Sequence, residues 1–140
     1  MLKLKILSVG KIKEEWLDEA FREYVKRLKR FVQIECSWAK DSHQLVEWAQ
    51  KEIDYICLDP AGRLYKSEEF AQFLFEQWEK RGSRLTLIIG GAEGLPLELR
   101  QKGTLISLSP LTFTHQMTRL VLIEQIYRTI EIQKGSKYHK

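Results

Sequence analysis

Long hydrophobic runs, cysteines and prolines are all scarce in this chain of 140 residues. No apolar run approaches the roughly 18 residues of a membrane span. The start of the chain alternates apolar residues with lysines, unlike the uninterrupted core of a signal peptide. These absences favour a cytoplasmic protein that does not act in a membrane. No repeat, low-complexity tract or linker divides the sequence, so one domain over residues 1–140 is expected.

The two cysteines do not indicate a disulfide or a metal site. Cys36 and Cys57 both fall in expected strands, where a buried free thiol is the ordinary outcome. Apolar residues make up 44% of the chain and charged residues 30%, which suits an ordinary globular core. The net charge of +4 is a mild indication of an anionic partner such as nucleic acid.

Apolar periodicity predicts strands that alternate with helices. The expected strands cover residues 2–9, 32–38, 55–58, 85–89 and 104–108. The expected helices cover residues 14–29, 43–52, 67 to about 82, 97–101 and 115–134. Ser42 and Ser67 are predicted to be the N-caps of the second and third helices. This alternation implies an α/β fold with a mostly parallel sheet and helices on both faces.

The first predicted helix is amphipathic. Its apolar residues recur at spacings of three and four and are expected to face inward: Trp16, Leu17, Ala20, Phe21, Tyr24 and Leu28. Its other face carries five basic residues: Arg22, Lys26, Arg27, Lys29 and Arg30. Two interpretations of this basic face stay open, a solvated surface and an RNA-contacting surface that Lys11 and Lys13 extend.

Three loops follow expected strands and lie at one edge of the predicted sheet, where ligands bind in open α/β folds. They come after Leu58, at residues 90–94 and at residues 108–114. The glycine loop is not Gly-x-Gly-x-x-Gly, so it is a poor match to a dinucleotide fingerprint. The last loop mixes hydroxyl and aliphatic side chains with free backbone groups. This mixture suits a nucleoside-like ligand.

The last predicted helix, residues 115–134, is apolar on more than one side, so it needs more than one neighbour. The sheet supplies one, and a second copy of the chain is a candidate for the other. His115 is a candidate helix cap or ligand contact, and Arg119 a candidate for a substrate phosphate or a structural carbonyl. The final Tyr138-His139-Lys140 has two interpretations, a frayed end or groups that stack on a base and meet a phosphate.

Four motifs in this order resemble the RlmH-type (YbeA) ribosomal RNA methyltransferases of the SPOUT class. They are Gly90-Gly91-x-x-Gly94, Ser107-Leu108-Ser109-x-x-Thr112-Phe113-x-His115, Leu122-Ile123-Glu124-Gln125-x-Tyr127-Arg128 and Tyr138-His139-Lys140. The resemblance covers nearly the whole chain, from residues 4–11 to the last residue. It implies a SPOUT-like domain with a C-terminal trefoil knot, a homodimer and a methyltransferase that uses S-adenosyl-L-methionine.

The resemblance also implies which residues form the site. The three loops would hold S-adenosyl-L-methionine through Leu58, Gly90, Leu108, Ser109, Pro110, Leu111, Thr112 and Phe113. The implied reaction methylates N3 of a pseudouridine in 23S rRNA of the large subunit, in the assembled ribosome and without a metal. His139 is the candidate base or orienting group, Tyr138 the stacking or hydrogen-bonding partner and Arg119 a candidate stabiliser. Each active site would be finished by the partner chain.

The sequence departs from the family at three places. Thr114 stands where proline is common, which is expected to alter the rigidity of that loop, and Ala92 replaces a proline or serine. The stretch after the second strand is shorter than usual. A non-catalytic RNA- or ribosome-binding α/β protein is the alternative function, and an enzyme using another nucleotide is a third. Small residues at Gly90 and Gly94 and the Tyr-His ending favour the methyltransferase.

Overall fold

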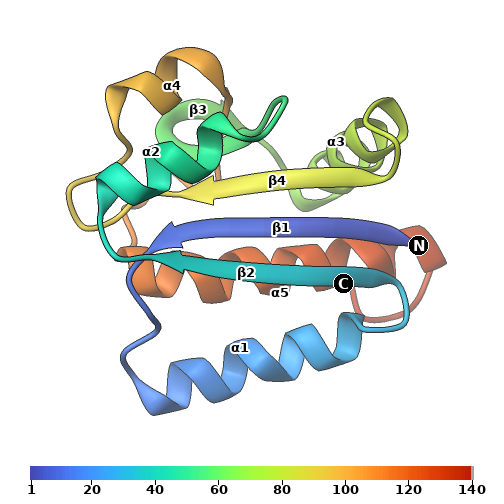
Figure 1. The fold of residues 1–140 in the computed structure, drawn as a ribbon. Helices are drawn as coiled ribbons and strands as arrows, with labels where there is room; N and C mark the ends of the chain where they lie inside the picture. The colour runs from blue at the N-terminus through green and yellow to red at the C-terminus, as the bar shows by residue number, and fades with distance from the viewer. Residues whose placement is uncertain (140) are drawn as a thin grey trace.

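The computed structural model describes residues 1–139, and in this part of the chain five parallel strands form one sheet (Figure 1). The strands are β1 (Leu2–Val9), β2 (Val32–Ala39), β3 (Ile56–Leu64), β4 (Arg84–Ile89) and β5 (Thr104–Ser107). Their spatial order is β2-β1-β4-β3-β5. The predicted α/β fold with a parallel sheet is therefore confirmed. The predicted trefoil knot is not tested by strand order and stays a prediction.

Helices cover both faces of this sheet, as predicted. Within residues 1–139 they are α1 (Glu15–Leu28), α2 (Ser42–Gln50), α3 (Ser67–Lys80), α4 (Leu97–Lys102) and α5 (His115–Lys134). Helices α1, α3 and α5 pack on one face, and α2 and α4 pack on the other (Figure 1). No helix in the described residues is long and apolar enough to cross a membrane.

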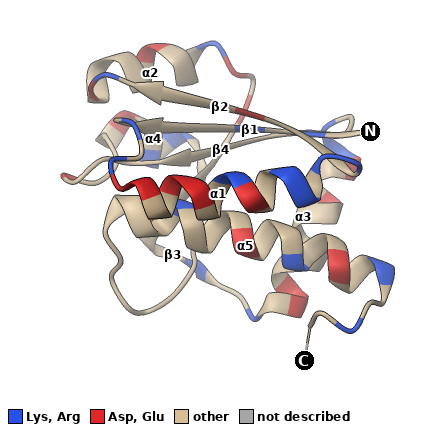
Figure 2. Cartoon of the chain, turned by 90° about the horizontal axis from the view of Figure 1, so that it is seen from below, with Lys and Arg blue, Asp and Glu red and all other residues tan. Residues whose placement is uncertain are grey.

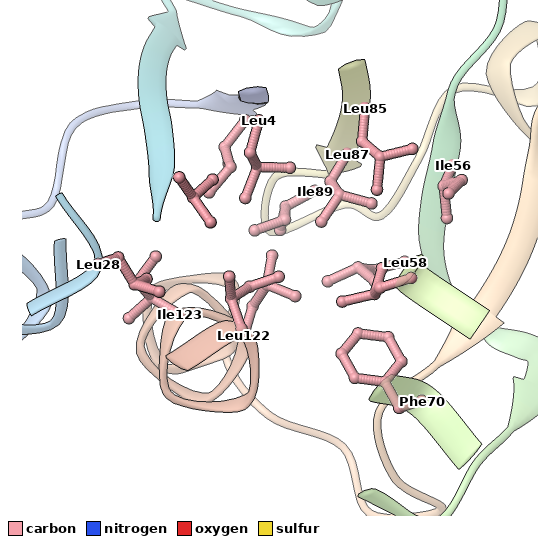
Figure 3. Packing of buried hydrophobic residues seen from close by; sticks show 14 of the residues in the cluster. Leu4, Leu28, Ile56, Leu58, Phe70, Leu85, Leu87, Ile89, Leu122 and Ile123 are labelled. Carbon is pink, nitrogen blue, oxygen red and sulfur yellow. The ribbon is translucent and has the colours of Figure 1, made fainter. Parts of the chain in front are cut away.

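The larger core lies between the sheet and α1, α3 and α5 (Figure 3). Leu4 of β1 and Leu87 of β4 point from the sheet toward Leu122 and Ile123 of α5, and all four are at most 1% exposed. Residues of opposite parity, such as Ile88, face the smaller core under α2 and α4. Burying each such aliphatic side chain contributes about 1.5–3 kcal/mol. The central strands are therefore apolar on both faces because both faces are covered.

The helix starts differ from the predictions by one residue. Asp41 is the N-cap of α2, and its carboxylate accepts a hydrogen bond from a first-turn backbone N–H at 2.9 Å, so Ser42 is already helical. Ser67 is likewise the first residue of α3. There the Glu69 carboxylate accepts a hydrogen bond from the backbone N–H of Lys66 at 2.8 Å. In both cases the serine was the wrong choice of cap because a neighbouring carboxylate satisfies a free N–H.

Strand β3 extends beyond its predicted end at Leu58. Leu58 pairs with Ile106 of β5, the register then shifts, and Arg63 pairs with the same residue. In the bulge between them, the Asp59 carboxylate accepts a hydrogen bond from the Ala61 backbone N–H at 2.8 Å. The predicted turn exists, but the chain resumes pairing after it, as at a β-bulge. Two residues of the bulge, Asp59 and Pro60, lie at the edge of the sheet that carries the candidate site.

Two helices differ from their predicted surroundings. Leu17, Phe21 and Leu28 of α1 are buried as expected, but Trp16, in the same turn as Leu17, is 57% exposed. Helix α5 packs between α1 and α3 as well as on the sheet. These two helices therefore cover part of the apolar surface that the sequence assigned to a second copy.

Candidate active site at the carboxyl ends of the strands

A cavity of about 810 Å³ lies where β4 ends and where β3 stops pairing with it, at Leu58. Leu58, Asp59 and Pro60 come from β3 and Ile89 from β4. The loop after β4 supplies Gly90, Gly91, Ala92, Gly94 and Leu95, and residues 112–118 span the end of the loop before α5 and the first turn of that helix. The first turn of α1 supplies the remaining wall. The volume falls within the roughly 300–1,000 Å³ of small-molecule sites. Parallel strands thus bring together segments that lie far apart in the sequence, at the edge that the sequence predicted.

The glycine loop presents bare backbone to this cavity. A Cβ atom on Gly90 would lie 2.6 Å from the carbonyl carbon of Gly94 and 2.8 Å from the backbone nitrogen of Leu95, so no side chain fits there. Gly94 has φ +85°, which favours glycine, and its N–H donates to the Gly91 carbonyl at 2.9 Å. The loop is therefore a compact turn folded on its own backbone, and its three glycines line the cavity without side chains.

The predicted cofactor residues divide into two groups. Leu58, Gly90, Thr112 and Phe113 line the cavity. The other four are not among its lining residues: Leu108, Ser109, Pro110 and Leu111. These four form a closed turn before Thr112, in which the Ser109 hydroxyl accepts a hydrogen bond from the Leu111 backbone N–H at 2.9 Å. The turn positions the cavity-lining pair that follows it.

Sequence reasoning missed the wall that α1 contributes. Glu14 and Trp16 line the cavity, although Trp16 was expected to face the core. The side chain of Gln116 ties this wall to α5: its Oε1 accepts from the Lys13 backbone N–H, and its Nε2 donates to the Lys11 carbonyl, both at 3.1 Å. No sequence motif signals such a link over more than 100 residues.

Thr114 and His115 resolve the question of the α5 cap. The Thr114 hydroxyl accepts a hydrogen bond from the Met117 backbone N–H at 3.1 Å, so Thr114 is the N-cap. His115 lines the cavity instead. Its pKa is lowered by burial and then by the positive charges of Arg119 and Lys13. A neutral imidazole at neutral pH follows from that direction.

Arg119 is fully buried beneath the cavity and is not one of its lining residues. Its Nη2 donates to Ser8 Oγ at 3.0 Å and to the Val9 carbonyl, and its guanidinium lies 4.5 Å from the centre of the Trp38 ring. Nε and Nη1 have no hydrogen-bond partner within residues 1–139. Burial lowers the pKa of Arg119 to about 10, so it remains a cation at neutral pH. The structure thus shows the carbonyl contact, one of the two predicted roles.

The described part of the C-terminal tail is docked on α5 and is not frayed. The Tyr138 hydroxyl donates to the Glu124 carboxylate at 2.7 Å, and the Arg128 guanidinium lies 4.9 Å from the centre of the Tyr138 ring. His139 Nδ1 lies 3.0 Å from Nη1 of Arg128, and its Nε2 contacts the Glu68 carboxylate. The predicted contribution of Lys140 lies outside the described residues. Burial and the Glu124 contact both raise the pKa of Tyr138.

The tail and the cavity occupy different parts of α5. Met117 lines the cavity, whereas Arg128 holds the tail, and at about 1.5 Å per residue these positions are roughly 16 Å apart along the helix axis. Tyr138 and His139 are not among the residues that line the cavity of their own chain. The structure therefore does not bring together the two halves of the predicted site within one chain.

Comparison with known proteins assigns the fold described above. The family model described as Predicted SPOUT methyltransferase matches residues 2–139. The chain belongs to the SPOUT methyltransferase family. A protein of Protochlamydia amoebophila, named Ribosomal RNA large subunit methyltransferase H, is 70% identical over 140 residues, which are all of both chains. The protein of the same name from Streptococcus uberis is 42% identical over 159 aligned positions, covering 99% of this chain and 100% of that one.

These matches confirm the resemblance to RlmH-type proteins and the predicted enzyme class, a SPOUT methyltransferase. The alignment of 159 positions also shows that this 140-residue SPOUT chain lacks residues present in the streptococcal relative. A solved methyltransferase structure from Legionella pneumophila with bound SAM aligns with a TM-score of 0.46 at 15% identity, covering 92% of this chain and 66% of that one. That likeness is too distant to assign a ligand.

Proposed function

We propose that this chain transfers a methyl group from S-adenosyl-L-methionine to N3 of a pseudouridine in 23S rRNA of the large ribosomal subunit. The observation that carries this function is the cavity at the strand ends, in a chain that matches a methyltransferase family over residues 2–139. The full-length relatives named Ribosomal RNA large subunit methyltransferase H support the choice of substrate. In this proposal the whole chain acts as one SPOUT-like domain. The reaction takes place in the cytoplasm, because its substrate is ribosomal RNA.

The cavity fits the cofactor chemically. Gly90 lines the cavity without a side chain, so its backbone groups are offered to an adenine edge. Leu58, Ile89 and Phe113 offer apolar walls for the ring, and Thr112 a hydroxyl for a ribose. When bound, the cofactor supplies a methyl group that its sulfonium already activates. The protein then has to align the acceptor nitrogen with that methyl group and exclude water.

The tail supplies the acid–base chemistry in this proposal. An imide N3–H is weakly acidic, so a nearby base accelerates its removal. His139 is that base or orients the acceptor, and Tyr138 contacts the target base. In the docked tail both ring nitrogens of His139 face protein groups, Arg128 and Glu68. His139 therefore takes up a proton from the substrate only after it leaves at least one of these partners.

A homodimer completes the site in this proposal, with the tail of one copy at the cavity of the other. The roughly 16 Å between the two positions on α5 supports this arrangement, as do the partly exposed Leu120 and Val121 on the same helix. Buried Arg119 places a positive charge under the start of α5, where it stabilises negative charge that develops on the pyrimidine. Its location indicates a positioning or electrostatic role.

The test is transfer of labelled methyl from S-adenosyl-L-methionine to ribosomes that lack the modification, beside isolated large subunits and free rRNA. Label in 23S rRNA, mapped to N3 of a pseudouridine, is the expected result. Label only in whole ribosomes would add that the assembled ribosome is required. If the cofactor binds but no substrate is labelled, the target is wrong. If the cofactor does not bind, the non-catalytic RNA-binding alternative replaces the methyltransferase.

Replacing His139 by alanine tests the tail. We expect turnover of ribosomes to fall about 100-fold, the lower range for loss of a general base. The dissociation constant of S-adenosyl-L-methionine should not change, because in this proposal His139 acts on the acceptor base, whereas the cofactor is held by Leu58, Gly90 and the loop before α5. Single-turnover rates across pH measure the first effect, and calorimetric titration of the cofactor measures the second. Unchanged turnover at every pH would refute the proposed role.

A further inference from the structure

We propose that the loop before α1 and the first turn of that helix form a nucleotide-binding subsite at the mouth of the cavity. In this subsite Trp16 stacks on an unpaired base of the RNA, and Lys11 and Lys13 contact the flanking phosphates. The inference rests on the proposed function, because it identifies where the RNA substrate lies beside the cofactor cavity. The ligand class is a single-stranded or flipped-out nucleotide of an RNA.

The exposure of Trp16 is informative because of where this residue lies. Trp78 is 1% exposed, whereas Trp16 is 57% exposed. Exposure alone means little, since Ile53 is 95% exposed away from the cavity. Trp16, however, is one of the residues that line the cavity. An aromatic ring that is both accessible and on a cavity wall is a stacking surface for a nucleobase.

This wall is held in place by the start of α5. Gln116 lines the cavity and bonds to the backbone of both Lys11 and Lys13 at 3.1 Å. The loop is therefore fixed relative to Thr112 and Phe113, which line the same cavity. A stacking ring on a fixed wall orders the base with little loss of protein conformational freedom, which favours binding. Gln116 thus couples the proposed subsite to the predicted cofactor residues.

The charged side chains around the cavity mouth indicate where the phosphates and where the base of the RNA would bind. Figure 2 shows acidic residues along the first half of α1 and basic residues toward its end. Glu14 lines the cavity, so a phosphate is disfavoured inside it. The exposed side chains of Lys11 and Lys13 lie just before this acidic segment and form no ion pair within residues 1–139. This distribution of charge favours a neutral base inside the cavity and phosphates beside Lys11 and Lys13. In this subsite the Glu14 carboxylate accepts a hydrogen bond from an N–H of the base.

The cavity has room for this second ring. Its volume of about 810 Å³ is in the upper part of the roughly 300–1,000 Å³ range of small-molecule sites. A methyl transfer needs the acceptor base and the donor in one enclosed space. A stacking ring on the wall of the cavity that Gly90 also lines would hold the acceptor base, or the base next to it, beside the donor. The same lining residues therefore serve both substrates.

The experiment compares Trp16→Ala and Trp16→Phe with the wild-type protein. We expect Trp16→Ala to raise the KM for ribosomes at least about 10-fold, since base stacking contributes roughly 1–3 kcal/mol. Trp16→Phe, which retains a stacking ring, should stay within about threefold of the wild type. The dissociation constant of S-adenosyl-L-methionine and the mass in light scattering should not change. Phe31→Ala is the matched control, because Phe31 is an exposed aromatic beyond the other end of α1.

A second variant tests the phosphate contacts. Lys11→Ala with Lys13→Ala should weaken ribosome binding and lower the slope of log K against log salt by about 1–2. An unchanged KM in Trp16→Ala would overturn the subsite. A smaller mass for Trp16→Ala would also overturn it, since Trp16 would then be a contact between copies. If the wild type methylates no substrate yet binds ribosomes in a Trp16-dependent manner, the proposed function fails while the subsite stands.

Discussion

The two ends of α5 carry the two halves of the candidate site and are built in different ways. At its start, the cavity is formed by residues from four distant segments, within 14–17, 58–60, 89–95 and 112–118. At its end, the tail is held by side chains of the same helix, Glu124 and Arg128, and by Glu68 of α3. The cofactor half therefore depends on the whole sheet. The tail half depends on a few local polar contacts and is easier to rearrange.

Gly90→Ala should disrupt the cavity and leave the tail intact. The added Cβ would lie 2.6–2.8 Å from backbone atoms of Gly94 and Leu95, which cannot move aside as a flexible side chain does. We expect the cofactor dissociation constant to rise about 100-fold, since overpacking costs roughly 1–3 kcal/mol. Gly91→Ala is the control: its Cβ would meet only side-chain atoms of Val9, the nearest at 3.2 Å. If isothermal titration gave the two variants the same cofactor affinity, the close packing at Gly90 would have no role in cofactor binding.

Arg119 offers a pair of variants that separates packing from charge. Arg119→Ala leaves a cavity and two unpaired acceptors, Ser8 Oγ and the Val9 carbonyl, and should lower the free energy of unfolding by about 3 kcal/mol. Arg119→Met keeps most of the volume and removes a buried cation that has no carboxylate partner within residues 1–139, but it leaves the same two acceptors unpaired. It should therefore cost less than the alanine variant, about 1–2 kcal/mol. Urea unfolding measures both. If Arg119→Met also keeps full turnover, the guanidinium has only a structural role.

Removing the α5 cap should have a smaller effect, confined to the cavity end. Thr114→Ala loses the hydrogen bond to the Met117 N–H and should cost about 1 kcal/mol of stability. The matched control is Asp41→Ala at the start of α2, which loses an equivalent cap at 2.9 Å. Both should lower the urea midpoint similarly, but only Thr114→Ala should weaken cofactor binding, because α2 does not line the cavity. Equal cofactor affinity in the two variants would contradict a role for the cap in the site.

His115 should make the smallest contribution, visible as a pH dependence. Its folded-state pKa lies below the ordinary 6.5, with burial as the first cause. Below pH 6.5 the unfolded chain therefore binds more protons at this position, so stability is full above pH 6.5 and decreases as the pH falls toward the folded pKa. His115→Gln should lose less stability than the wild type between pH 7.5 and 5.5, measured by urea unfolding. Parallel curves for the two proteins would show that His115 does not contribute.

Much of the fold was predictable because its signals are local. The alternation in residues 2–9 and the apolar run at residues 85–89 mark strands whatever their neighbours are. The carboxyl-edge location of the site then follows from parallel strand ends, so Leu58 and Gly90 were placed correctly at one cavity. The bulge in β3 was not predictable, because it depends on Arg63 pairing again with β5.

Side-chain surroundings were harder to predict than strands. Helical spacing put Trp16 in the core, but Trp16 is 57% exposed and lines the cavity, while the adjacent Leu17 is buried. The sequence around Arg119 does not show whether its side chain faces a ligand or a carbonyl. The structure answers this by placing Ser8 of β1 within hydrogen-bond distance of the guanidinium. The Gln116 contact joins residues more than 100 positions apart, which periodicity cannot reveal.

The contact of Gln116 with the backbone of Lys11 and Lys13 determines when, during synthesis, the protein becomes active. The wall with Trp16 is made early in synthesis, but the residues that fix it belong to the last helix. Loop closure over such a distance makes folding slow compared with local contacts. A ribosome therefore releases a chain whose binding site assembles only after the final helix has emerged. Chains truncated before α5 should accumulate as inactive products, even though all five strands and the whole glycine loop precede that helix in the sequence.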